Sequence, residues 1–294
     1  MKIPDRKGCW YLLCGFAVAC GGARSSPPPP APSPLPVTPA AQPVAPIVPS
    51  VGASSFKYAS GAVRYRISRS AAIESTAPDS QSHHEVSTNA TSEILTLEPA
   101  ESSTNFTALM DTSTTTTQGL IGSVQPVQLP VQVSGSFTDS SLTINTENVS
   151  GKCNTVSSML AADLRNLLIA FPERLSTGVT WKDSTDVQGC QAGVPTSTHA
   201  TRSFIVSGDS SYNGHPVLVV LRTDTTRARG EGGLQQHRVS IDAVGSGTAL
   251  YYLDPINGRV LRLIVDQLLD IDVTASGTRS QFKQNSKQEF QAVP

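Results

Sequence analysis

After Val51, apolar and polar residues alternate along most of the chain, which is the pattern of strands with one buried face. The segments with this pattern are 56–68, 93–97, 105–117, 131–146, 178–183, 201–207, 216–226, 236–244, 248–253, 259–274 and 278–290. Asn213-Gly214 and Asn257-Gly258 supply residues that accept the positive φ of tight turns. Short connections between successive strands favour antiparallel neighbours.

One segment has the period of a helix instead. Six apolar residues fall on one face at a spacing of 3.6 residues, namely Val156, Met159, Leu160, Leu164, Leu167 and Leu168. Thr155 or Asn154 can cap the N-terminus of this helix, and Pro172 ends it. We expect the apolar face to pack on the sheet.

The fold class expected from these patterns is mainly β (α+β). We predict a curved antiparallel sheet, or an open half-barrel, of about ten to twelve strands with one main helix packed on it. A closed barrel and two half-domains remain alternatives at this point.

The first 19 residues have the features of a secretory leader. Lys2, Arg6 and Lys7 form a positive N-terminal region, and 10–19 is an apolar run of ten residues. This run is too short to cross a bilayer, which takes about 20 residues, but it suits a signal peptide.

The run ends in Ala17-Val18-Ala19-Cys20-Gly21, which resembles the lipobox of bacterial lipoproteins. The resemblance implies that the thiol of Cys20 carries a diacylglyceryl group and that cleavage leaves Cys20 as the first residue. Each buried methylene of the acyl chains contributes about 0.8 kcal/mol to membrane binding. Gly21 lacks the aspartate that marks retention in the inner membrane of some bacteria. The resemblance therefore implies an outer-membrane anchor that faces the periplasm.

A proline-rich segment separates this cysteine from the alternating region. Between Pro27 and Pro49, 11 of 23 residues are proline. Such a chain adopts extended polyproline II at about 3.1 Å per residue, so residues 21–50 reach about 90 Å. We therefore expect three parts: a signal peptide at 1–19, an anchor and tether at 20–50, and a β-rich domain at 51–294.

Composition excludes several classes of function. The net charge is -1 and charged residues make up 15%, with no cluster of Lys and Arg that would attract nucleic acid. Aromatic residues are only 5%, which argues against a base-stacking platform. The sequence has no P-loop, dinucleotide fingerprint or G-x-S-x-G nucleophile motif. We therefore expect no nucleic-acid partner and no cofactor.

The five histidines form no obvious metal or catalytic site. His83 and His84 are adjacent, beside Glu85, and neighbours on a strand point to opposite faces. His199, His215 and His237 are isolated, and a surface position is the simplest interpretation of each.

Two other groups of residues have a functional and a structural interpretation. Gly208-Asp209-Ser210 is similar to the nucleophile block of some esterases, but it lies late in the chain inside an expected hairpin. Asp270 and Asp272 share a strand face near Asp266, which suits paired carboxylates or calcium. Solvated strand edges are the interpretation that we prefer for these aspartates, since charges there discourage aggregation. We therefore assign no catalytic, cofactor-binding or metal residues.

The remaining cysteines form an even pair. Removal of the leader eliminates Cys9 and Cys14, and Cys20 would be lipidated. Cys153 and Cys190 would then be paired in an oxidising compartment. Closing this loop contributes about 4 kcal/mol by chain-entropy estimates. Two buried free thiols are the alternative.

Four short segments of the later part of the chain stand out, namely Trp181-Lys182-Asp183, Ser203 to Gly208, Gly245-Ser246-Gly247-Thr248 and Asp254 to Arg259. On these segments, residues 155–275 resemble the C-terminal β-domain of uncharacterised bacterial envelope lipoproteins. That family implies a β-domain in the envelope and no activity. Strands curved around a helix also resemble the open half-barrel of periplasmic lipoprotein carriers, a likeness of shape that does not decide function.

The sequence leaves the function unknown, and of three candidates we prefer the first, with the second as its main alternative. A structural or interaction module of the cell envelope has a packed interior, an exposed patch and a protein partner. A carrier has a pocket above about 300 Å³, lined by Leu, Val and Tyr, for a lipid or other hydrophobic ligand. A hydrolase needs a convergent set of His, Asp and Ser or Cys, and we do not expect an enzyme.

Overall fold

The structure is a computed structural model of the 294-residue chain. It describes residues 56–76, 82–100, 103–118, 129–138, 142–145, 155–191, 194–234 and 237–293. The expected leader, Cys20 and the expected tether lie outside these ranges, so the three-part division of the chain stays a prediction.

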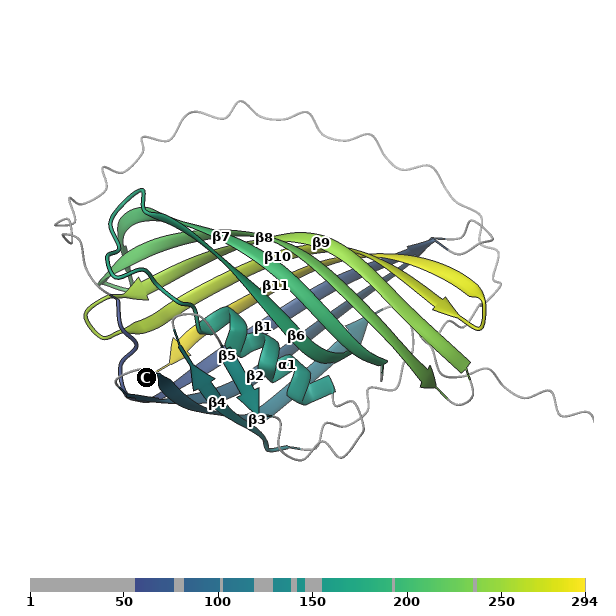
Figure 1. The fold of residues 1–294 in the computed structure, drawn as a ribbon, viewed down its shortest axis with the longest axis horizontal. Helices are drawn as coiled ribbons and strands as arrows, with labels where there is room; N and C mark the ends of the chain where they lie inside the picture. Colours follow the sequence, from purple (N-terminus) through teal and green to yellow (C-terminus); the bar gives the residue numbers. More distant parts are fainter. Residues whose placement is uncertain are drawn as a thin grey trace, which may run out of the picture.

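The described residues form one antiparallel sheet of eleven strands and one helix (Figure 1). The elements are β1 (Gly61–Thr76), β2 (Ser82–Pro99), β3 (Thr104–Gln118), β4 (Val131–Phe137), β5 (Leu142–Asn145), α1 (Thr155–Leu167), β6 (Thr180–Gln191), β7 (Val194–Tyr212), β8 (His215–Leu234), β9 (His237–Asp254), β10 (Arg259–Ala275) and β11 (Thr278–Val293). The sheet curls into a half-barrel, which confirms the fold class expected from the sequence.

The order of strands across the sheet is β5-β4-β3-β2-β1-β11-β10-β9-β8-β7-β6. The first described strand, β1, therefore lies in the middle of the sheet, and the chain runs outward from it to β5. It crosses through α1 to β6 at the other edge, and then returns to β11 beside β1. This central pair has a regular register, with Ile67 opposite Phe290.

The helix α1 lies across the opening of the curled sheet, where it contacts β6 on one side and β3 and β4 on the other (Figure 1). Of its residues whose side chains are described, Ala162 alone is exposed. The expected apolar face is confirmed, since Leu160, Leu164 and Leu167 are buried in the main core. The helix thus fills the concave face rather than covering one side of it.

Alternation decides which side chains reach this core. Tyr65 and Ile67 on β1, like Leu95 and Leu97 on β2, point inward at every second position and are buried. A second, smaller buried cluster lies at the other end of the long strands and contains Val194, Val239, Ile241, Ala243 and Ile271. Polar residues on the same inward faces separate the two clusters.

Two glycine-containing segments that fall between the strands predicted from the sequence belong to strands instead. Gly245-Ser246-Gly247 continues β9, and 230–233 continues β8. A Cβ on Gly245 would come within 2.1 Å of the Leu268 carbonyl oxygen, and one on Gly230 would come within 2.6 Å of the Pro195 carbonyl oxygen. Glycine therefore marks close backbone approach in a curled sheet here, and not a turn.

Candidate binding site on the concave face

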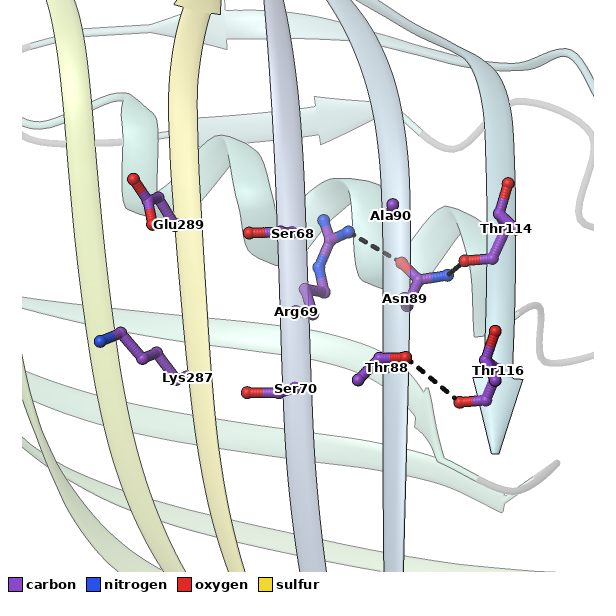
Figure 2. A pocket seen from close by; sticks show the side chains of 10 residues that line it. All are labelled: Ser68, Arg69, Ser70, Thr88, Asn89, Ala90, Thr114, Thr116, Lys287 and Glu289. Atoms are coloured by element: carbon purple, nitrogen blue, oxygen red, sulfur yellow. Dashed lines mark hydrogen bonds between the residues drawn. The ribbon is translucent and has the colours of Figure 1, made fainter. Parts of the chain in front are cut away.

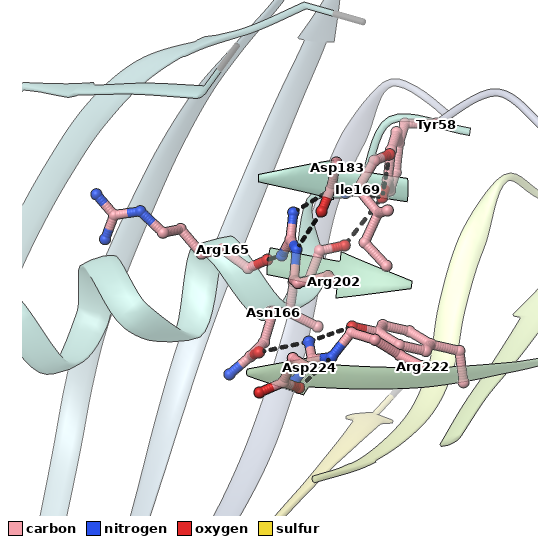
Figure 3. A network of polar contacts seen from close by, with 10 residues as sticks. Tyr58, Arg165, Asn166, Ile169, Asp183, Arg202, Arg222 and Asp224 are labelled. Carbon is pink, nitrogen blue, oxygen red and sulfur yellow. Dashed lines mark hydrogen bonds and ion pairs between the residues drawn. The ribbon is translucent and has the colours of Figure 1, made fainter. Parts of the chain in front are cut away.

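Three arginines point from the sheet toward α1. Arg69 lies on β1, Arg202 on β7 and Arg222 on β8, and their side chains are 11%, 8% and 4% exposed. Each of them donates a hydrogen bond to an oxygen atom of the helix. Two of these arginines are seen in Figure 3. Arginines rarely lie this deep in a protein without charged or oxygen partners, so this arrangement is the main polar feature of the fold.

Arg69 lies between two buried carboxylates. Its Nη2 is paired with Asp163 of α1 and is 3.5 Å from Oε1 of Glu93 on β2. Its Nη1 donates to Oδ1 of Asn89 at 3.1 Å and to Oγ1 of Thr91 at 2.8 Å. The Arg69 guanidinium thus contacts α1 and three residues of β2, one of which is Glu93.

This crowding changes the protonation of the carboxyl groups. Burial, together with the nearby charge of Asp163, raises the pKa of Glu93 to about 9 against the attraction of Arg69. Burial also raises the pKa of Asp163, against the lowering effect of Arg69. At neutral pH Glu93 therefore keeps its proton, and Asp163 is the carboxyl group that lies nearer to Arg69.

Arg222 makes the second contact with the helix. Its Nη1 donates to Oδ1 of Asn166 on α1 at 2.8 Å and to the hydroxyl oxygen of Tyr251 at 2.8 Å. Its Nε donates to Oδ1 of Asp224 at 3.0 Å (Figure 3). Asp224 is on the same strand and is itself buried, so it holds the guanidinium in place from the sheet side.

Arg202 makes the third contact, with the backbone of the helix. Its Nη1 donates to the carbonyl oxygen of Arg165 at 2.8 Å. Its Nε and Nη2 form a two-point pair with Asp183 on β6, at 2.7 and 2.6 Å. The side chain of Arg165 points away from this group (Figure 3).

The curl of the sheet brings these arginines to one helix. Arg69 and Arg222 occupy the same row, with Gln288, Val265 and Ala249 of the three intervening strands between them. In a flat sheet they would be about 19 Å apart. Their partners Asp163 and Asn166 are three residues apart on α1, which is less than one turn.

The first described residues of the chain fix the C-terminal end of α1. The hydroxyl of Tyr58 donates to the carbonyl oxygen of Leu167 at 2.9 Å and accepts from the backbone N–H of Ile169 at 2.8 Å (Figure 3). Ala59 N–H donates to the carbonyl oxygen of Gly258 at 3.1 Å, at the turn between β9 and β10. Burial raises the pKa of Tyr58, so its hydroxyl stays protonated and able to donate.

Seven aromatic rings form a continuous series around this end of the helix. Neighbouring ring centroids lie 4.6 to 6.5 Å apart. The rings belong to Phe137, Tyr58, Phe56, Phe171, Trp181, Phe204 and Tyr251. Aromatic residues are few in this chain, yet these seven gather where β4 and β6 face each other across the opening.

A cavity of about 340 Å³ opens on the outer face of the sheet, and Arg69 and Asn89 of the site just described are among the residues that line it. Polar side chains of β1, β2, β3 and β11 line it, and Figure 2 shows them with the helix behind the sheet. Ser70, Thr88, Thr116 and Lys287 are typical of this lining. It is not the Leu, Val and Tyr lining that we expected of a carrier's pocket.

The residues weighed in the sequence analysis do not converge. His199 lies on the outer face with its Nδ1 2.8 Å from Oδ1 of Asp186, and His215 lies at the exposed start of β8. The side chains of His83, His84 and His237 lie outside the described residues. Among the side chains that are described, no group of three His, Cys, Asp or Glu is placed to hold a metal ion.

The two motifs that also had a chemical interpretation, Gly208-Asp209-Ser210 and the aspartates of 266–272, lie on strands of the sheet. Gly208-Asp209-Ser210 lies on β7 just before the turn at Asn213, as we predicted. Asp266, Asp270 and Asp272 lie on β10, which pairs on both sides, so the expectation of strand edges was wrong. Their positions fall on the outer face of an inner strand, because β11 returns to the centre of the sheet.

The predicted disulfide is not decided by the described residues. Cys190 is buried near the end of β6, and Cys153 lies outside the described ranges. A Cβ on Gly189 would lie 3.8 Å from Cβ of Ser158, so the start of α1 lies against the end of β6. The pairing of Cys153 with Cys190 stays a prediction that this contact favours.

The sequence analysis missed Arg69, Glu93, Asp163, Arg202 and Arg222. A signal for them was present. Each of the three arginines, like Glu93, lies two positions from a buried apolar residue on the same strand face, and Asp163 lies one helical turn from Leu160 and Leu167. Arg69, for example, follows Tyr65 and Ile67 at a spacing of two. A charge on an inward phase is therefore the sequence feature that marks this site.

Comparisons with known proteins give no family. No protein-family model matches the chain, and no curated protein matches its sequence. Among solved structures, Neisserial surface protein A aligns with 79% of this chain and 99% of its own, at 8% identity and a TM-score of 0.23. Pseudomonas aeruginosa OpdQ aligns over the same shares at 7% identity and a TM-score of 0.19. Similarity at these scores supports no inference about function.

In the part of the chain that the structure describes, no helix has the length and hydropathy needed to cross a bilayer.

Proposed function

We propose that the domain binds a hydrophobic molecule on the concave face of its half-barrel, and that α1 occupies this face when the molecule is absent. The observation that carries the proposal is the manner in which α1 is held. One helix fills the opening of an otherwise continuous sheet, and three arginines of the sheet bind its oxygen atoms.

A ligand that displaces α1 must replace the apolar contacts of Leu160, Leu164 and Leu167, whereas the polar contacts of the helix oppose the exchange less. A buried ion pair contributes little net stability, because desolvation of the charges offsets most of their attraction. A helix held by Leu side chains alone would gain about 1.5–3 kcal/mol for each one. Asp163 and Asn166 stand on the face of α1 where further leucines would add this stabilisation. Their polar contacts with the arginines are ones that water can replace.

The structure offers less support to the other functions. A packed interior agrees with an interaction module, but the interior here is closed by one helix at the open side of the sheet. The hydrolase has no support among the described side chains, since His199 and His215 lie on the outside. The carrier, an alternative in the sequence analysis, therefore becomes our first choice.

The test of this function is made on protein extracted from its own membrane. Native mass spectrometry is expected to detect a co-purifying hydrophobic molecule, and its removal is expected to increase the amide-exchange protection of α1 without altering β9 and β10. Protein that is reproducibly empty, binds no member of a lipid panel and shows unchanged exchange in α1 would remove the carrier.

We also propose that Cys20 anchors the protein in the outer membrane. The positive N-terminal region, the apolar run and the Ala17-Val18-Ala19-Cys20-Gly21 sequence support this anchor. Replacing Cys20 with serine is expected to move most of the protein from the membrane pellet to the soluble fraction. Cys9→Ser, in the part of the leader that cleavage removes, is the matched control and should leave sedimentation unchanged. Continued sedimentation of Cys20→Ser would exclude a lipid on this cysteine.

A further inference from the structure

We infer that the molecule bound on the concave face is an amphiphile with an anionic head group, a carboxylate or a phosphate, whose oxygens replace those of α1 on the three arginines. This inference rests on the proposed function and adds the chemical class of the ligand.

The contacts between α1 and the arginines all have the same sense. Arg69 donates to the carboxylate of Asp163, Arg222 donates to the amide oxygen of Asn166, and Arg202 donates to the carbonyl oxygen of Arg165. The sheet supplies donors and the occupant supplies oxygen atoms in every case. A second occupant of the same face must therefore present oxygen acceptors, or leave three buried guanidiniums with fewer partners.

The arginines stay positioned when the helix leaves. Asp183 holds Arg202 at two points, and Asp224 holds Arg222. Asn89 and Thr91 hold Arg69 from β2. Because these partners belong to the sheet, the donor groups that α1 uses would remain directed into the concave face.

Arg69 is the position where a full negative charge is required. Its partner on the helix is a carboxylate, whereas Glu93 is farther away, at 3.5 Å. Its Nε is buried and has no hydrogen-bond partner among the described residues, so the guanidinium has a donor to spare. A phosphate or carboxylate has enough oxygen atoms to accept from both the Nη2 and the Nε of Arg69, which a single hydroxyl does not.

An apolar surface continues from these donors. The buried core that contains the leucines of α1 also contains sheet side chains that would become available to an acyl chain, and they include Leu95, Leu97, Phe106, Met110, Leu263 and Phe290. Donors for oxygens beside an aliphatic and aromatic floor match a molecule with one anionic end and one hydrocarbon end.

The experiment compares ligands that differ only in the head group. Dodecanoate, dodecyl phosphate and dodecanol are titrated below their micelle-forming concentrations into full-length Cys20→Ser protein, and inorganic phosphate is titrated separately. We expect the two anionic amphiphiles to bind at least about tenfold more tightly than dodecanol, and inorganic phosphate not to compete. Arg69→Gln is expected to remove the preference, while Arg227→Gln on the outer face keeps it.

A second variant changes the occupant instead of the site. Asp163→Asn weakens the hold of α1 on Arg69, so dodecanoate is expected to bind several-fold more tightly to it than to the parent protein. This variant keeps the test decisive if Arg69→Gln does not fold. Unchanged or weaker binding of dodecanoate to Asp163→Asn would contradict the proposal that its carboxylate takes the place of Asp163 beside Arg69.

The outcomes separate the two proposals. Equal affinity for dodecanoate and dodecanol overturns the anionic head group and leaves the carrier intact. Competition by inorganic phosphate as strong as that of dodecyl phosphate overturns the amphiphile, because the hydrocarbon chain then contributes nothing. Binding of no amphiphile overturns the carrier itself.

Discussion

Replacing Arg69 with alanine is expected to lower the free energy of unfolding by about 3–5 kcal/mol, the usual cost of removing one partner from a buried ion pair. The reason is that Asp163 and Glu93, both almost fully buried, lose the cation between them. Urea unfolding followed by tryptophan fluorescence measures the change.

The matched control is Arg227→Ala. Arg227 pairs with Asp242 on the outer face, where both side chains are about half exposed. Exposed pairs contribute about 1 kcal/mol or less, so this variant should unfold close to the parent protein. Equal losses from both variants would show that the buried position of Arg69 has no special importance.

Raising the pH from about 5 to about 9 is expected to reduce stability progressively, owing to Glu93. Its pKa is raised from 4.5 to about 9 in the folded protein, mainly by burial and then by Asp163. The folded state therefore keeps a proton that the unfolded chain releases above pH 4.5. The stabilisation is complete below that pH and is lost as the pH rises through about 9. Its slope is at most about 1.4 kcal/mol per pH unit.

The pH effect is tested with Glu93→Gln, which cannot lose a proton. Urea unfolding at several pH values should show a flatter dependence for this variant, with its largest advantage over the parent protein near pH 9. Glu289→Gln, at a partly exposed position beside Arg262, serves as the control and should keep the slope of the parent protein. The same slope in Glu93→Gln would mean that another group carries the effect.

The sequence predicted the fold well because its two periods are strong. The inward series Tyr65 and Ile67 is a plain strand signal, and the stripe through Leu160 and Leu164 is a plain helix signal. The predicted ends of the strands were less accurate, because glycine occurs both in turns and where two backbones approach closely. At Gly245 it allows the Leu268 backbone to approach, and the composition of a segment does not distinguish this role from a turn.

The site could not be predicted from periodicity alone. Arg69 and Arg222 reach the same helix only because the sheet curls, and curl depends on the twist of every strand pair. Local sequence shows that each charge lies on an inward phase, but it does not show which charges meet. The long separations along the chain between Arg69 and Asp163, and between Arg222 and Asn166, left these two contacts invisible before the structure.

The strand order also has a consequence for how the protein folds. Most strands pair with their neighbours in sequence through short hairpins, whereas β1 and β11 bring together residues about 220 positions apart. Local hairpins form in microseconds, while a contact across so long a loop has a large entropic barrier. We therefore expect two flanking meanders to assemble early and the seam between β1 and β11 to join last. The centre of the finished sheet would then be the last part of it to form.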